Sequence, residues 1–233
     1  MIRVEQEGWV ARISAPNFSA LSRHDIAFAT ELRDAVRSQA DRDDIKVLVL
    51  CATGEDFSPA LPSGQRAAPH AAWHAAYAAS TGLYQNLAFC KKIVVTAVRG
   101  GCHDAGSMLV LCSDFTVCAE ESRFGSPFDR LPEANMVLAA MSMRLNRAKS
   151  WMLAGIPLTP GQALRYGLVN RIEPASDVGT VALRMARTAA RTPLDGIAMS
   201  KIQVEAHLDS LGVGTEFDSA SFFAAAMRQG ELA

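Results

Sequence analysis

The chain has 233 residues, of which 49% are hydrophobic and 20% charged, so it can bury a sizeable core as one large domain. Its formal net charge is -1 and its basic residues are scattered, which argues against nucleic acid or an anionic membrane as the main partner. The five cysteines form no CxxC pair and lie in apolar runs, so we expect buried, reduced thiols in a cytoplasmic protein.

The sequence does not predict a targeting or membrane segment. The N-terminal residues MIRVEQEGWV have no apolar stretch behind a basic start, as a signal peptide would. The longest apolar region, residues 93–111, is interrupted by Arg99, His103 and Asp104. A membrane-spanning helix needs about 20 predominantly apolar residues, so we expect no membrane partner.

Apolar periodicity predicts the elements of the first half of the chain. Residues 2–14 alternate apolar and polar side chains around Glu7-Gly8, as two short paired strands do. Residues 24–40 repeat apolar side chains with the spacing of a helix face. In chain order we expect two strands within 2–14, a helix over 24–40, a buried strand over 46–51, a loop over 53–63 and an alanine-rich helix over 70–90.

The second half continues the same alternation of strand, loop and helix, which favours an α/β fold with crossover connections. We expect a strand over 93–98, a helix over 105–112, a strand over 114–119, and helices from Val181 to the end with a break at Pro193. The predicted division is a core over residues 1–175 and a helical region over 176–233. The apolar tail of that region suits packing on the core or on another subunit.

Two histidines, His70 and His74, share a helix face at a spacing that can bind metal. The segment reads HAAWH and lacks the glutamate of the HExxH zinc motif. We therefore interpret this face as a packing surface and predict no metal site.

Several motifs between Asp56 and Asn170 stand in a recognisable order. They are Asp56-Phe57-Ser58-Pro59-Ala60-Leu61, then Cys112-Ser113-Asp114, Ser122-Arg123-Phe124-Gly125-Ser126-Pro127 and Gly167-Leu168-Val169-Asn170. In this order and spacing they resemble the enoyl-CoA hydratase/isomerase (crotonase) family over about residues 2–175, and more loosely over the tail. The resemblance implies a spiral of ββα units with a C-terminal helical oligomerisation layer, assembled as a homotrimer or hexamer.

The resemblance also implies a chemistry. In this family two backbone N–H groups form an oxyanion hole for the thioester carbonyl of an acyl-CoA and for the enolate made from it. Carried over by position, the two donors are the amides of Leu61 and Ala105. The implied coenzyme A segment comprises Phe57, Ser58, Pro59, Ala60 and Ser63. No other cofactor is implied; acyl-CoA is the substrate or ligand, as in fatty acid metabolism.

The chain departs from the family pattern at the residues that move protons. The family's triple glycine becomes Asp104-Ala105-Gly106. The two glutamates with which hydratases activate water fall at Met108 and Phe128, and neither side chain can transfer a proton. The sequence therefore argues against ordinary hydration by two carboxylates.

Three other residues are candidates for the proton carrier. Asp129 lies one residue beyond the usual glutamate, and Glu133 lies further along the same loop. His103 directly precedes the second oxyanion segment, and an imidazole is a natural proton shuttle near neutral pH. For each of the two acids, a solvated surface residue is the favoured interpretation. We interpret Asp104 as the N-cap of the helix that follows it.

Two alternatives to a thioester enzyme remain. Ser107 in Asp104-Ala105-Gly106-Ser107-Met108 resembles the nucleophile of serine peptidases of the ClpP type, which share the spiral fold, although a base would have to be His207 in the tail. The other alternative is a non-catalytic crotonase-like protein that binds a ligand or a partner subunit.

Overall fold

The computed structural model describes residues 1–61, 70–127 and 134–219. The strands are β1 (Arg3–Glu7), β2 (Val10–Ala15), β3 (Val47–Ala52), β4 (Ile93–Val98), β5 (Gly101–Cys102), β6 (Phe115–Ala119), β7 (Arg123–Phe124) and β8 (Arg171–Glu173). The helices are α1 (Ser19–Ser22), α2 (Ile26–Ala40), α3 (His70–Ala88), α4 (Ala105–Leu111), α5 (Met136–Ser142), α6 (Leu145–Met152), α7 (Pro160–Tyr166), α8 (Val178–Ala189) and α9 (Leu194–Ser210). These elements confirm the predicted α/β class.

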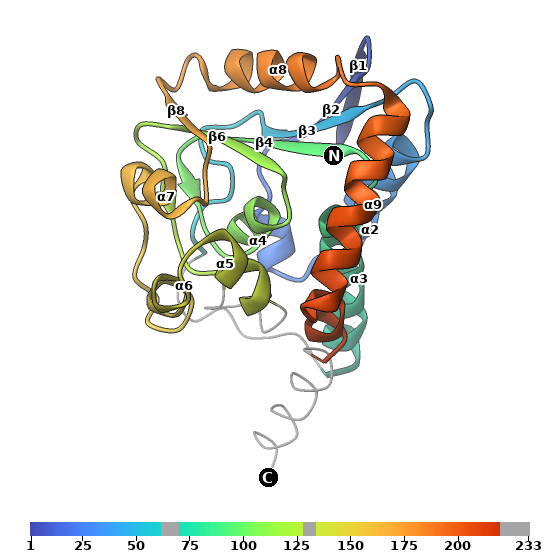
Figure 1. The fold of residues 1–233 in the computed structure, drawn as a ribbon. Coiled ribbons are helices and arrows are strands. Elements are labelled where there is room, and N and C mark those ends of the chain that lie inside the picture. Colours follow the sequence, from blue (N-terminus) through green and yellow to red (C-terminus); the bar gives the residue numbers. More distant parts are fainter. Residues whose placement is uncertain (62–69, 128–133, 220–233) are drawn as a thin grey trace.

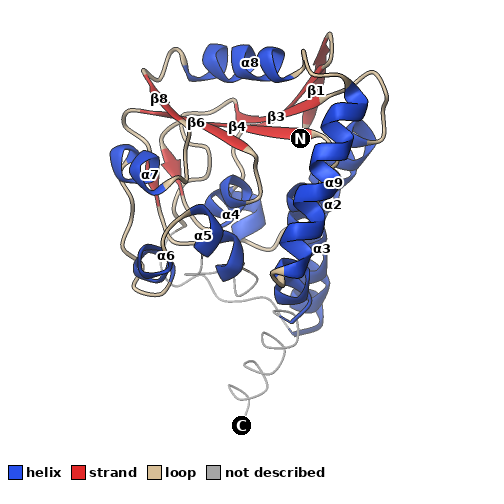
Figure 2. Cartoon of the chain, in the orientation of Figure 1, coloured by secondary structure: helices blue, strands red, loops and turns tan. Residues whose placement is uncertain are grey.

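The main sheet has the strand order β1-β2-β3-β4-β6-β8. The β1–β2 hairpin is antiparallel, and every later pair in this sheet is parallel. Parallel neighbours need crossover connections, which the helices between the strands supply. Helix α8 lies across one face of the sheet, while α4 and α5 lie on the other side of it (Figures 1 and 2).

The central strands β3, β4 and β6 are buried on both faces, as their continuous apolar runs predict, whereas the edge strand β1 is exposed. Successive side chains of β3 alternate between the two sides. Leu48 and Leu50 join the larger core, which includes α4, whereas Val47 and Val49 join a smaller core with Val178 and other residues of α8. The face covered by α8 is therefore separated by the sheet from the face on which α4 packs.

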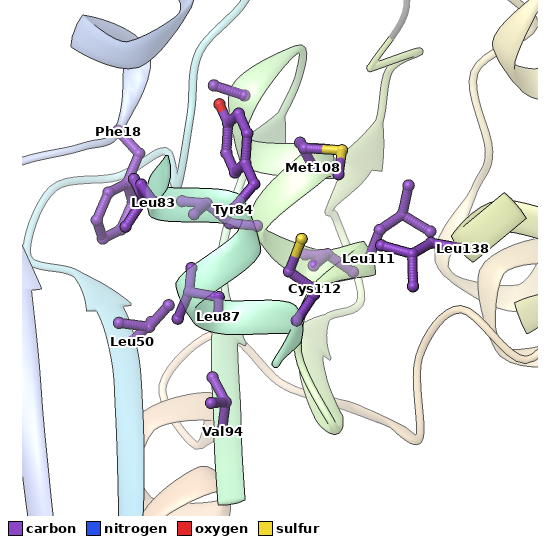
Figure 3. Close-up of a cluster of buried hydrophobic side chains, with 14 of the residues drawn as sticks. Phe18, Leu50, Leu83, Tyr84, Leu87, Val94, Met108, Leu111, Cys112 and Leu138 are labelled. Carbon is purple, nitrogen blue, oxygen red and sulfur yellow. The ribbon is translucent and has the colours of Figure 1, made fainter. Parts of the chain in front are cut away.

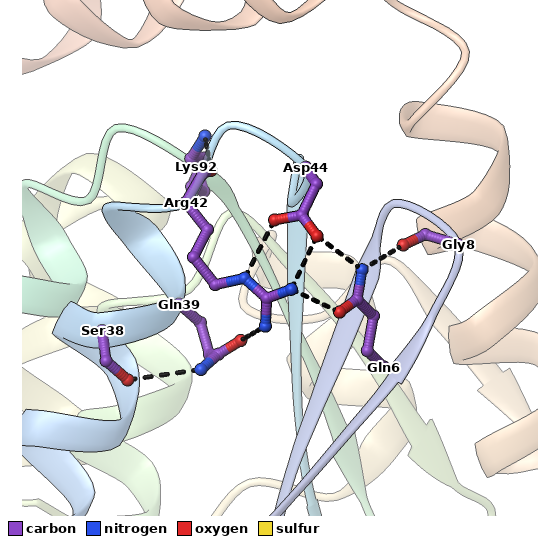
Figure 4. Close-up of polar contacts among 7 residues, drawn as sticks. All are labelled: Gln6, Gly8, Ser38, Gln39, Arg42, Asp44 and Lys92. Atoms are coloured by element: carbon purple, nitrogen blue, oxygen red, sulfur yellow. Dashed lines mark hydrogen bonds and ion pairs between the residues drawn. The ribbon is translucent and has the colours of Figure 1, made fainter.

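A polar cluster ties the β1–β2 hairpin to the turn between α2 and β3 (Figure 4). The guanidinium of Arg42 donates to both carboxylate oxygens of Asp44, at 2.9 and 2.6 Å, and to the side-chain oxygen of Gln6 at 2.6 Å. Hydrogen bonds from Arg42, and then from Gln6, lower the pKa of Asp44 to about 2. The cluster fixes the edge strand of the sheet in place.

The sequence predicts that the cysteines are buried, reduced thiols. Cys90, Cys102, Cys112 and Cys118 are buried free thiols, as expected, and burial raises the pKa of Cys118 to about 12. Cys51 differs because it is only partly buried.

Among the described residues, the helices are all too short or too polar to cross a lipid bilayer.

Candidate active site

A small second sheet brings together the two segments that the sequence predicts as amide donors. Ser58 forms a bridge with Cys102 of β5, and β5 pairs in parallel with β7. The Ser58 N–H donates to the Gly101 carbonyl at 2.8 Å, and the His103 N–H donates to the Ser58 carbonyl at 2.9 Å. The loop that ends at Leu61 is thereby fastened beside the chain that enters α4.

Gly106 allows this close approach. A Cβ atom on Gly106 would lie well under 3.0 Å from the Ser58 Cβ, and within 3.3 Å of a ring carbon of Phe57. The backbone of Ser58 is held by hydrogen bonds on both sides, so it cannot move aside easily. The one glycine left of the family's triple is thus the one that the packing requires.

Replacing Gly106 by Ala is expected to lower the free energy of unfolding by about 2 kcal/mol, because the added methyl group overpacks the contact between the loop and α4. Urea unfolding followed by circular dichroism measures the change. Gly161→Ala is the matched control, since a Cβ there meets nothing within 4 Å and alanine suits a helix better. Equal effects of the two substitutions would show that the loop and α4 do not pack as described.

Asp56 holds the turn that leads from β4 into the small sheet. Its Oδ1 accepts the Gly101 N–H at 2.6 Å, and the neighbouring Gly100 has a φ of 57° that glycine adopts readily. A Cβ on Gly100 would collide with that carboxylate and with the Glu55 carbonyl. Sequence reasoning missed this role, because an aspartate in a loop carries no signal for a partner 45 residues away.

Asp104 takes the N-cap position of α4 but not in the predicted way. Its φ of 48° and ψ of -114° match the first central residue of a type II′ turn, where glycine is usual. Its side chain makes no capping hydrogen bond with α4, so the prediction of a capping carboxylate is wrong. A non-glycine residue with this positive φ stores strain of about 1–3 kcal/mol.

The amide of Ala105 is engaged within the protein. It donates to the hydroxyl oxygen of Ser22, at the end of α1, over 3.2 Å. Ala105 and Ser22 are both buried. A thioester oxygen that binds this amide must therefore take the place of the Ser22 hydroxyl.

The predicted coenzyme segment is largely tied into the fold. Phe57 is fully buried, and its ring packs against that of Phe18 with the ring centroids 4.7 Å apart. The Phe57 N–H donates to the main-chain carbonyl of Arg99, and the Phe57 carbonyl accepts the Phe18 N–H. Ser58 is equally buried, and its hydroxyl has no hydrogen-bond partner in the described part of the chain.

The residues that follow are more open to a ligand. Pro59 and Leu61 are half-buried, and Ala60 is exposed. Ser63 lies outside the described residues. Coenzyme A binding by this segment stays a prediction.

Met108 stands where the family has its first glutamate, and it is fully buried in the main core. Its side chain lies beside Tyr84, with Leu111 and Leu138 also in this cluster (Figure 3). An ionised carboxylate in these largely apolar surroundings would lose its hydration, which is costly. The structure thus gives a packing role to the position, and Phe128, at the second glutamate position, lies outside the described residues.

Of the three candidate proton carriers, His103 alone belongs to the described residues. The half-buried ring of His103 packs against Gly101 and Gly125, close to the start of α4. Asp129 and Glu133 lie outside the described residues, as do the side chains of His70 and His74. In the part of the chain that is described, no three histidine, cysteine or acidic residues are grouped to hold a metal ion.

Ser107 is poorly arranged for a nucleophile. It is fully buried, and its hydroxyl lies 2.8 Å from the Cys102 carbonyl oxygen and 2.7 Å from that of Gly125. A serine nucleophile needs an accessible oxygen whose proton goes to a base such as histidine. Here the hydroxyl proton is donated to main-chain carbonyls, which link α4 to the small sheet.

Comparison with known proteins agrees with this architecture. The family model described as Enoyl-CoA hydratase/isomerase matches residues 11–227. The crystal structure of an enoyl-CoA hydratase/isomerase from Xanthobacter autotrophicus Py2 superposes with a TM-score of 0.82 at 24% identity, covering 97% of this chain and 86% of that one. That likeness concerns the fold.

Two curated proteins are similar in sequence. EchA13 of Mycobacterium tuberculosis is 26% identical over 212 residues, which cover 90% of this chain and 62% of EchA13. The 4-chlorobenzoyl coenzyme A dehalogenase-2 of Arthrobacter sp is 26% identical over 219 residues, covering 87% and 77%. The chain thus spans less than two thirds of the length of EchA13.

Proposed function

Because this chain belongs to the enoyl-CoA hydratase/isomerase family, we propose that it binds an acyl-CoA thioester and stabilises the enolate form of its acyl group. In this proposal the amides of Leu61 and Ala105 donate to the thioester oxygen. Negative charge that develops on this oxygen is stabilised by fixed donors that need no reorganisation.

One observation carries the proposal, namely the hydrogen-bonded bridge between Ser58 and Cys102. The bridge fastens the chain three residues before Leu61 to the chain three residues before Ala105. Two separate loops are thereby held side by side, next to the first turn of α4, whose amides carry partial positive charge. The contact at Gly106 locks this arrangement.

A proton must also move if the bound thioester reacts. We propose Asp129 as the carrier, with His103 and Glu133 as alternatives. In the reaction the carrier removes a proton from the α-carbon, the carbon–hydrogen electron pair forms the enolate double bond, and negative charge moves onto the oxygen. Return of the proton reverses the step.

A specific observation favours a second candidate function, in which the protein binds a thioester without reacting. Met108 occupies a sealed apolar position where hydratases place a proton-transferring glutamate. A chain that has lost this group keeps the fold and the amide donors, but it can no longer activate water in the usual way.

Solvent exchange at the α-carbon separates the two candidates. The full chain is incubated with butyryl-CoA in D2O, binding is measured by calorimetry, and deuterium uptake is followed by mass spectrometry. The proposal expects saturable binding and deuterium at the α-carbon, with uptake abolished in Asp129→Asn. Binding without uptake supports the non-catalytic candidate, whereas absence of binding contradicts both.

Ser22→Ala is expected to strengthen butyryl-CoA binding about fivefold, because the thioester oxygen no longer competes with a hydroxyl for the Ala105 amide; a typical hydrogen bond is worth about 1 kcal/mol. The dissociation constant is measured by calorimetry. Ser19→Ala is the control on the same helix, since the Ser19 hydroxyl bonds to Asn17 and Arg23 instead. Unchanged affinity in Ser22→Ala would mean that the thioester does not reach this amide.

We also propose that the protein assembles as a homotrimer or hexamer in the cytoplasm. Helix α9 exposes large apolar side chains, which favours burial against another subunit. They are Met199, Ile202 and Val204, with Leu211 just beyond the helix. Light scattering of the full chain should give three or six times the chain mass of 25.0 kDa. A single chain mass at micromolar concentration would contradict this assembly.

A further inference from the structure

A cleft of about 480 Å³ opens on the face of the sheet that α8 covers. It lies at the carboxyl ends of β2, β3 and β4, between the β1–β2 hairpin and the start of α8; we call it the α8 cleft. Ala105 belongs to the core on the opposite face of the sheet, so the α8 cleft is separate from the proposed thioester site.

Three arginines from three different strands or strand ends line the α8 cleft. They are Arg3 of β1, Arg12 of β2 and Arg99 after β4, and the one lining acid among the described residues is Glu5. Glu5 forms an ion pair with Arg12. Arg99 donates from one nitrogen to the carbonyls of Ala52 and Gly54, which leaves its other N–H groups available. The lining therefore carries a net positive charge.

Arg3 provides an uncommitted cation at the rim. Within the described residues its guanidinium makes no hydrogen bond or ion pair. Cys51 lines the same cleft. Burial raises the pKa of its thiol, Arg12 and Arg99 lower it, and Glu5 adds a smaller effect in the raising direction.

Ser14 adds a polar group to the cleft. The residue is only 5% exposed overall, and it lines the α8 cleft. A hydroxyl can donate to an anionic oxygen bound there.

The rest of the wall is mixed. Thr53, Ser176 and Thr180 add polar side chains, whereas the partly or fully exposed apolar residues are Ala52, Ala175 and Leu183. The amides of the first turn of α8, a helix of 12 residues, add partial positive charge at the same end. A ligand that fits both halves has an anionic head and an apolar body.

We propose that the α8 cleft binds a small organic anion whose phosphate or carboxylate group meets Arg3, Arg12 and Ser14, with its apolar body against Ala52, Ala175 and Leu183. Guanidinium groups match both oxygen anions in geometry and charge. The cleft is larger than a bare phosphate requires, and this favours an organic body.

Calorimetry with the full chain at low salt tests the proposal, with phenyl phosphate and benzoate as probes and benzyl alcohol as the neutral control. We expect saturable binding of at least one anion and none of the alcohol. Tighter binding of phenyl phosphate identifies a phosphate head, and tighter binding of benzoate a carboxylate head. If neither anion saturates the protein up to about 10 mM, the proposal is overturned.

Two pairs of variants locate the binding. Arg3→Gln should weaken the anion about fivefold, whereas Arg37→Gln, an exposed arginine on α2, should leave it unchanged. Gly179 lines the cleft, and a Cβ there meets nothing within 4 Å, so larger residues fit. Gly179→Glu should weaken binding at least about tenfold relative to the isosteric Gly179→Gln, by repulsion of like charges. Equal affinities within both pairs would place the anion elsewhere and overturn the proposal.

Discussion

Met108→Glu is expected to lower the free energy of unfolding at pH 7 by about 4 kcal/mol. The side chain is fully buried among apolar neighbours, so a glutamate there must stay protonated in the folded state. Protonating a carboxyl of ordinary pKa near 4.3 at pH 7 costs about 1.4 kcal/mol for each pH unit of difference. The substitution restores the family's residue type and still damages the protein.

The pH dependence of this loss has a definite sign. A buried glutamate has a higher pKa in the folded than in the unfolded chain, so folding takes up a proton and the penalty grows as pH rises. Relative to wild type, Met108→Glu should be closer in stability at pH 5 than at pH 7 in urea unfolding. Met108→Leu is the control and should change stability by less than about 1.5 kcal/mol. A glutamate tolerated as well as leucine would indicate an open, hydrated position and revive the carboxylate mechanism.

Lys201→Met is expected to lower the free energy of unfolding by about 3 kcal/mol. The Lys201 ammonium lies 2.7 and 2.9 Å from the two carboxylate oxygens of Asp114, which also accepts the Val94 N–H at 2.8 Å. Lys201 is almost completely buried. Removing the cation leaves a partly buried carboxylate without its charge partner, which is costly in proteins.

This ion pair fastens α9 to the amino-terminal edge of β4 and β6, so its loss should loosen α9 before the sheet. Hydrogen exchange of the α9 amides, measured beside urea unfolding, should rise in Lys201→Met. Lys149→Met is the control, because Lys149 is exposed on α6 and should change stability by less than about 0.5 kcal/mol. Equal effects of the two substitutions would mean that the pair does not hold α9.

The sequence predicted the long elements because their signals are local. The strand over 93–98 and the helix over 70–90 follow from continuous apolar runs and alanine content, and β4 and α3 confirm them. The two-residue strands β5 and β7 were not predicted, since so short a segment has no periodicity. They exist because Ser58, Cys102 and Phe124 meet through tertiary contacts.

The sequence predicted which chain segments form the candidate site, but it could not predict which residues contact one another there. The resemblance placed two amide donors at Leu61 and Ala105, and the structure brings their loops together through Ser58. It could not indicate Ser22, which lies 83 residues from the amide that it binds. The capping prediction for Asp104 failed because residue type alone does not reveal a positive φ. The proton carrier stays a prediction.

A crystal structure of the full chain with bound butyryl-CoA tests whether the two amides hold the thioester oxygen. We expect this oxygen about 2.7–3.1 Å from the amide nitrogens of Leu61 and Ala105, with the Ser22 hydroxyl displaced from Ala105. A bound thioester whose oxygen lies away from both amides, with the bond from Ala105 to Ser22 intact, would contradict this expectation.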